Sequence, residues 1–128
     1  MRFLIDTHSF LWFGAGSPQL SQAAQVLIGD PSNQPLLSMA SLWEIAIKLS
    51  VGKLRLAHPF ATLTPQQLGQ QGIIVLNIQF RHLVKTTELP LHHRDPFDRL
   101  LVAQALVEQL PIISADSAFD AYGVTRLW

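Results

Sequence analysis

Two short apolar runs, far apart in the chain, each end close to an aspartate. Arg2–Ile5 reads RFLI and is followed at once by Asp6, and Ile112–Ile113 is followed three residues later by Asp116. Between them, apolar runs of strand length alternate with segments of helical composition. That alternation is typical of a parallel sheet with helices on both faces. Because ligands bind outside the carboxyl ends of parallel strands, we expect the two aspartates at a common site.

The pattern predicts an α/β sandwich with a parallel sheet of four or five strands. The expected strands are residues 2–5, 35–38, 73–76, 112–113 and 124–127. The expected helices follow Thr7, cover 22–28, 42–50, 65–71 and 78–86, run from Asp95 to Leu110, and leave a turn or short helix at 117–121. Residues that favour helix starts are Thr7, Ser17 with Pro18, Ser38 or Ser41, and Thr64 with Pro65.

Composition narrows the class of protein. The 128 residues predict one domain spanning 1–128, and 48% hydrophobic against 14% charged residues excludes a disordered chain. Nine basic and nine acidic residues cancel, so the chain lacks the overall basic character of many nucleic-acid binders. Without cysteine there is no thiolate metal site, which fits a reducing compartment. Asp6 and His8 interrupt the first apolar run, which argues against a signal peptide or membrane span and favours a cytoplasmic protein.

Three acids on expected helices have structural and functional interpretations. Asp95 fits a helix N-cap before Pro96, and Asp98 suits the positive end of the helix dipole. Asp98 also heads an apolar face, where a carboxylate needs a partner such as a cation. Glu44 can pair with Lys48 at helical spacing, worth about 0.3–0.5 kcal/mol, but its apolar neighbours suggest a buried helix.

Asp6 and Asp116 fit caps after their strands, yet together with Glu44 and Asp98 they place four acids on four different elements. Hard oxygen ligands without cysteine suit Mg²⁺ or Mn²⁺. One or two such ions can activate water and stabilise the oxygens of a phosphodiester under attack. The pattern therefore favours metal-dependent hydrolysis of a phosphodiester, with Asp6, Glu44, Asp98 and Asp116 as catalytic residues and metal ligands.

The remaining polar and aromatic residues give weaker signals. No His-x₃-His helical pair exists, so the histidines are expected at the surface or beside the ligands: His8, His58, His82, His92 and His93. The aromatic residues favour core positions over base stacking: Phe10, Trp12, Phe13, Trp43 and Phe97. Two small basic groups are expected in solvent, where they can also touch phosphates: Lys48, Lys53 and Arg55, and Arg94 with Arg99.

Four segments resemble the PIN-domain family, and within it the VapC-type toxin ribonucleases. They are FLIDTHSFLW, SMASLWEIAIKLSVGKL, RDPFDRLLVAQAL and the strand-end SAD, which lie in family order along nearly the whole chain. The resemblance implies a PIN-like three-layer sandwich and an acidic site formed by Asp6, Glu44, Asp98 and Asp116, with Asp95 as a neighbour. Ser114 and Ala115 stand before the last acid, where threonine is frequent in the family.

The resemblance also implies an activity and partners. Family members bind Mg²⁺ or Mn²⁺ and cut RNA, and VapC-type members form homodimers that a small antitoxin protein silences. The leading hypothesis is thus the toxin of a type II toxin–antitoxin pair, an endoribonuclease. The alternative is a PIN fold that binds RNA or protein without cutting. A haloacid-dehalogenase-type phosphatase is disfavoured because His8 stands where its second aspartate would be.

Overall fold

Five strands form one sheet in which every neighbouring pair is parallel, in the order β3–β2–β1–β4–β5. The computed structural model describes all residues, 1–128. The strands are β1 (Arg2–Ile5), β2 (Gln34–Ser38), β3 (Ile74–Leu76), β4 (Ile112–Ile113) and β5 (Arg126–Leu127). The expected parallel α/β architecture is therefore confirmed.

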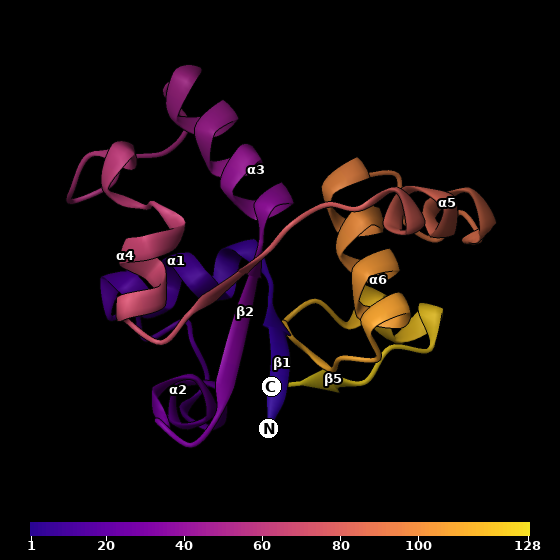
Figure 1. Cartoon of the computed structure of the whole chain (residues 1–128), viewed down its shortest axis with the longest axis horizontal. Helices are drawn as coiled ribbons and strands as arrows, with labels where there is room; N and C mark the ends of the chain where they lie inside the picture. Colours follow the sequence, from indigo (N-terminus) through magenta and orange to yellow (C-terminus); the bar gives the residue numbers. More distant parts are fainter.

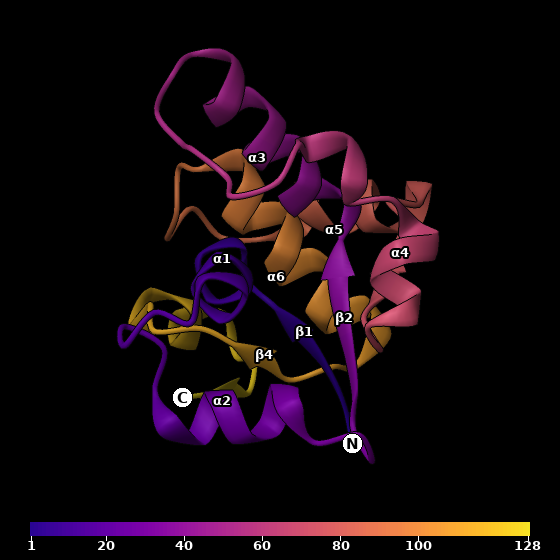
Figure 2. The same ribbon diagram turned by 90° about the vertical axis from the view of Figure 1, so that its left-hand side faces the viewer.

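Helices cover both faces of this sheet. The six α-helices are α1 (Thr7–Ala15), α2 (Gln22–Gly29), α3 (Met39–Ser50), α4 (Pro65–Gln70), α5 (Phe80–Glu88) and α6 (Pro96–Glu108). Two 3₁₀ segments, η1 (Phe60–Thr62) and η2 (Ser117–Tyr122), complete the fold. Figure 1 shows α5 and α6 to one side of the strands and α1, α2 and α4 to the other, with α3 above them, and Figure 2 views the molecule from the side of α1, α2 and α4. None of the helices combines the length and the hydrophobicity that crossing a membrane would require.

The central strand β1 contributes side chains to two separate hydrophobic cores. Phe3 and Ile5 pack into a cluster with residues of α1 to α4, whereas Leu4 packs into a second cluster with α6 and η2. All three side chains are fully buried. Successive side chains of a strand point to opposite faces, so three consecutive apolar residues require cover on both. This sandwich fixes β1 and, with it, the position of Asp6 directly after the strand.

Two helix caps differ from the expected helix starts Thr7 and Ser17. The cap of α1 is Asp6, whose Oδ1 accepts a hydrogen bond from the Ser9 amide at 2.8 Å, and not Thr7. The Thr7 hydroxyl instead donates to Ser41 Oγ at 2.9 Å and thereby ties α1 to α3. The cap of α2 is Ser21; the Ser17 hydroxyl accepts from an amide only two residues later, in a turn that α2 does not continue.

Two further differences concern the end of the chain and one histidine. The last strand is confined to Arg126–Leu127, because Gly123 closes η2 at a φ of 78° and the chain needs two more residues to join the sheet. His82, expected at the surface or beside ligands, is fully buried. Its Nε2 lies 3.0 Å from Glu108 Oε1, and its Nδ1 accepts from the Gln79 amide at 3.0 Å. The ring therefore joins α5 to α6.

Arg99 anchors the segment that links α5 to α6. Its guanidinium donates to the carbonyl oxygens of Thr86 and Pro90, both at 2.9 Å, and to that of Leu89 at 3.4 Å. Carbonyls at a helix C-terminus lack helical partners, and a charged donor satisfies them well. Arg99 is thus held by the protein itself and is not a free phosphate contact, as the sequence had allowed.

Replacing this arginine should destabilise the fold. We expect Arg99→Ala to lower the free energy of unfolding by about 2 kcal/mol, because charge-assisted hydrogen bonds are lost and carbonyls are left unpaired. The matched control is Arg94→Ala, at an exposed arginine, which should change it by less than about 0.5 kcal/mol. Urea unfolding measures both, and equal stabilities would refute the anchoring role.

Candidate functional site

The four acids predicted as ligands lie around the carboxyl edge of the sheet. Asp6 follows β1, and Asp116 follows the neighbouring strand β4. Glu44 lies in the second turn of α3, which begins directly after β2, and Asp98 lies in the first turn of α6. Because β2, β1 and β4 are adjacent and parallel, the segments that leave them start at the same edge.

Asp98 and Asp116 converge on a third side chain, that of His93. Asp98 Oδ2 lies 3.8 Å from His93 Nδ1, and Asp116 Oδ2 lies 3.6 Å from His93 Nε2. One potential ligand atom from each of the three residues lies within 4.8 Å of the others. His93 Nε2 is buried and has no hydrogen-bond partner. The imidazole therefore faces the two carboxylates without being satisfied by them.

Aromatic residues of η2 hold this imidazole in place. The His93 ring stacks on Tyr122, with planes 6° apart and centroids at 6.1 Å, and it also contacts Phe119 at 5.7 Å. The backbone amide of His93 donates to the Tyr122 hydroxyl at 2.6 Å. Both the ring and the main chain of His93 are thus fixed by the element that Asp116 caps.

Glu44 and Asp95 keep the structural partners that the sequence suggested for them. Glu44 is only 8% exposed, and its carboxylate pairs with Lys48 at 3.2 Å. Asp95 is exposed and caps α6, where its Oδ1 accepts from the amides of Phe97 and Asp98. Neither belongs to the close group formed by His93, Asp98 and Asp116, although both lie near enough to influence Asp98.

Asp6 adjoins the group from the other side. It is 7% exposed, and it lines a cavity of about 300 Å³ together with His8, Trp12, Ala115 and Asp116. Asp116 therefore borders both this cavity and the three-residue group. Of the four predicted acids, Asp98 and Asp116 meet at His93, Asp6 lines a cavity together with Asp116, and Glu44 lies near enough to contribute to the raised pKa of Asp98.

The environment of Asp98 disfavours its negative charge. Burial is the largest cause, and the neighbouring carboxylate of Asp95 is the next; together with smaller contributions from Glu44 and Asp116 they raise the pKa of Asp98 to about 6. His93 acts in the opposite direction. Like charges near one another in a partly buried site favour protonation of one of them.

These observations fit a divalent cation. Two carboxylates and a neutral imidazole are ligands that Mn²⁺ accepts, and Mg²⁺ binds through carboxylates and water. His93 Nε2 is buried without a hydrogen-bond partner beside the Asp116 carboxylate, and both groups are of a kind that binds metal ions. The residues best placed to hold the ion are Asp98, Asp116 and His93, with Asp6 and Glu44 beside them.

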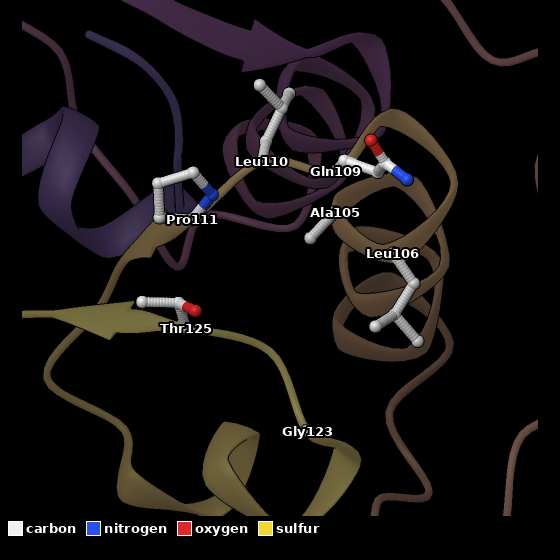
Figure 3. Close-up of a pocket in the computed structure, with 7 residues that line it drawn as sticks. All are labelled: Ala105, Leu106, Gln109, Leu110, Pro111, Gly123 and Thr125. Atoms are coloured by element: carbon white, nitrogen blue, oxygen red, sulfur yellow. The ribbon is translucent and has the colours of Figure 1, made fainter.

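A larger cavity, of about 350 Å³, lies at the opposite edge of the sheet (Figure 3). Its walls include Pro111 and Thr125, which precede β4 and β5, and the end of α6. Figure 3 shows Leu106, Leu110 and Gln109 around it, and no carboxylate or imidazole lines it. It therefore lacks the groups needed for metal binding or acid–base chemistry.

His93 is the site residue that sequence reasoning undervalued. Two adjacent histidines precede α6, and only the fold distinguishes them: His93 faces the acids, whereas the exposed His92 contacts the edge of Tyr122. Its position three residues before the first residue of α6 and five before Asp98 was the available signal. Stacking on a tyrosine near the end of the chain was not visible in the local pattern.

Comparison with known proteins agrees with this fold. The family model of the PIN domain matches residues 3–124. Ribonuclease VapC16 of Mycobacterium tuberculosis is 36% identical over 58 residues, which cover 45% of this chain and only 41% of that protein. Among solved structures, VapBC2 from Rickettsia felis, bound to a DNA fragment from their promoter, superposes with a TM-score of 0.69 at 12% identity, covering 99% of this chain and 98% of that one. A toxin–antitoxin complex from Klebsiella pneumoniae gives a TM-score of 0.65 at 15% identity, covering 98% and 96%.

The protein is a parallel α/β domain with acidic residues close together at the carboxyl edge of its sheet. The family model covers almost all of the chain. The chain belongs to the PIN domain family. The expected resemblance is thereby confirmed at the level of the family and its fold.

The raised pKa of Asp98 predicts a pH dependence of stability. The native state holds this proton more tightly than the unfolded chain, in which the pKa is near 3.8. The carboxyl therefore favours the native state fully below about pH 4, and this contribution is lost as the pH rises through about 6. We expect the stability of the parent minus that of Asp98→Asn, measured by urea unfolding in EDTA, to fall between pH 4 and 7. A difference that is constant or rises would contradict the assignment.

Proposed function

We propose that this protein is a metal-dependent endoribonuclease and the toxin of a type II toxin–antitoxin pair. The observation that carries the proposal is the convergence of Asp98, Asp116 and His93 at the carboxyl edge of a PIN domain. The relative with the matching segment is named a ribonuclease, which supports RNA as the substrate. All four predicted acids are present at this edge, which favours catalysis over the alternative of a fold that only binds.

The proposed site divides its work among this chain's residues. Asp98, Asp116 and His93 would hold a Mg²⁺ or Mn²⁺ ion, with Asp6 and Glu44 completing the acidic site directly or through water. The bound cation supplies activation of water and stabilisation of the charge that develops on the phosphodiester during hydrolysis. Tyr122 orients His93 by stacking and by accepting its amide hydrogen bond. Lys48 offsets the charge of Glu44.

Partners follow from a different part of the surface. The helix α5 exposes three apolar side chains, those of Phe80, Leu83 and Val84. This surface suits a homodimer, and the toxin–antitoxin complex among the structural neighbours supports an antitoxin protein as the second partner. The proposal places this single domain in the cytoplasm, where RNA and antitoxin are both accessible.

Replacing a proposed ligand should abolish cleavage without unfolding the protein. We expect Asp6→Asn and Asp98→Asn each to lower the rate of RNA cleavage in Mg²⁺ by about 100-fold or more, because an amide binds the cation far less well than a carboxylate. Gel assays of a labelled RNA measure the rates, and circular dichroism checks the fold. The matched control is Asp30→Asn, at an exposed aspartate that bonds only Ser32, and it should cut like the parent. A folded Asp98→Asn protein that cuts at the parental rate would sink the proposal.

Metal binding should be measurable without RNA. At pH 7.5, Mn²⁺ at about 100 times its dissociation constant should stabilise the parent by about 2.7 kcal/mol. Asp98→Asn should remove most of this gain, and Asp30→Asn should keep it. His93→Ala should also reduce this stabilisation, because the imidazole is one of the three proposed ligands. Metal-independent stability together with RNA binding and no cleavage would establish the binding-module alternative instead.

A further inference from the structure

The cavity that Asp6 and Asp116 line borders the proposed metal site, and the proposed function assigns no part of the substrate to it. Its volume is about 300 Å³, and residues from two separate segments of the chain line it. Asp6, His8 and Trp12 come from the start of the chain and α1, and Ala115 and Asp116 come from the segment after β4. A volume at the lower end of the range for ligand pockets suits one heterocycle and not a longer ligand.

Aromatic rings form one wall of this cavity. The His8 and Trp12 rings lie 5.7 Å apart at an angle of 39°, and Trp128 contacts Trp12 at 6.1 Å. Trp12 is partly buried against the hydrophobic core, so the indole is held in position, while His8 is exposed. The sequence favoured a core position for Trp12; the structure places this indole at the rim of the core, with part of it lining a cavity.

Asp116 connects the cavity to the proposed metal site. Its Oδ2 lies 3.6 Å from His93 Nε2 in the three-residue group, and the same residue lines the cavity. Whatever occupies the cavity therefore lies next to the point at which a phosphodiester would be cut. In RNA, each ribose joined by a phosphodiester carries a nucleobase. In a single strand, a base next to the cut is therefore the group that could enter this cavity.

We propose that this cavity binds one unstacked nucleobase next to the scissile phosphodiester, with Trp12 as its stacking surface and His8 at its edge. The inference rests on the proposed ribonuclease function and adds to it a binding site for one base, which must be free to leave the stack. Stacking on an aromatic side chain suits every base and needs no basic surface, which accords with a chain of zero net charge. Proteins commonly read single-stranded RNA by splaying bases onto aromatic rings.

The exposed polar groups give the cavity a means to discriminate between bases. The His8 ring nitrogens can donate or accept, and a carboxylate oxygen of Asp116 can accept from an exocyclic amino group. We therefore expect the Trp12 indole to provide most of the affinity for the base, and His8 and Asp116 to determine which base is preferred. A cavity of this kind predicts a sequence preference at one nucleotide only.

The test asks whether the effect of removing one base from the RNA depends on the presence of the Trp12 indole. The cut site in a short single-stranded RNA is mapped first, and a series of RNAs is then made with one abasic nucleotide at each position around it. For the parent, removal of one base next to the cut should lower kcat/KM about tenfold or more, because one stacking contact is lost. For Trp12→Ala, the intact RNA should already show this loss, and removal of that base should add little.

Two variants and one binding measurement make the result independent of folding. Trp12→Phe keeps an aromatic surface and should retain most of the coupling, and His8→Ala changes an exposed side chain and should alter the preference among bases at that position. The matched control is Trp43→Ala, which removes an indole that is 59% exposed on α3 and does not line the cavity. It should show the parent's penalty for each abasic RNA. With Ca²⁺ in place of Mg²⁺, 2-aminopurine at the coupled position should lose fluorescence on binding the parent but not Trp12→Ala.

The outcomes separate the two proposals. One outcome is that the parent cuts RNA but the loss of any one base lowers kcat/KM equally for the parent and for Trp12→Ala. That outcome would overturn the nucleobase pocket and leave the proposed ribonuclease function intact. A cavity that serves only a protein partner would give this same result, with Trp12→Ala equal to the parent on every RNA. No cleavage of any RNA by the parent would overturn the proposed function and the pocket together.

Discussion

The repulsion between carboxylates gathered at one edge of the sheet is the constraint around which this molecule is built. Parallel strands β1 and β4 deliver Asp6 and Asp116 to the same edge, and α3 and α6 bring Glu44 and Asp98 toward it. Two like charges 4 Å apart at an effective dielectric constant of 20 repel by about 4 kcal/mol. That is a large share of the 5–15 kcal/mol by which small proteins are stable, so the sheet and its two cores must hold the edge together.

The segment between α5 and α6 carries much of that work. Arg99 holds its first part through the carbonyls of Thr86, Leu89 and Pro90, and the Tyr122 hydroxyl holds the amide of His93. These hydrogen bonds hold the segment that leads into α6 at Thr86, Leu89, Pro90 and His93. The residues that hold this backbone, Arg99 and Tyr122, are therefore different from those proposed to bind the metal ion.

The sequence predicted the order and type of most elements because most strands are short apolar runs and most helix starts carry a Ser, Thr, Asp or Pro signal; α5, which begins after Gln79, carries none of these signals. It could not choose between neighbouring signals: Thr7 or Asp6, and Ser17 or Ser21, are equally good caps by residue type. The choice depended on partners elsewhere, such as Ser41 for Thr7. His93 and Trp12 were undervalued for the same reason, since Tyr122 and Trp128 contact them from more than 25 residues away in the chain.

Helix capping and metal binding are not exclusive roles for the acids of this edge. Asp116 accepts the Ala118 amide on Oδ1, while its Oδ2 faces His93 at 3.6 Å. Asp6 uses Oδ1 for the Ser9 amide and has its second oxygen free of protein hydrogen bonds. A carboxylate has lone pairs for several partners, so the cap fixes its orientation and leaves one oxygen for a cation. Asp95, whose Oδ1 accepts two amides in an exposed position, shows the same cap without convergence on the group. Capping thus explains how Asp6 and Asp116 are held, and the site arises where these two acids approach Asp98 and His93 at one sheet edge.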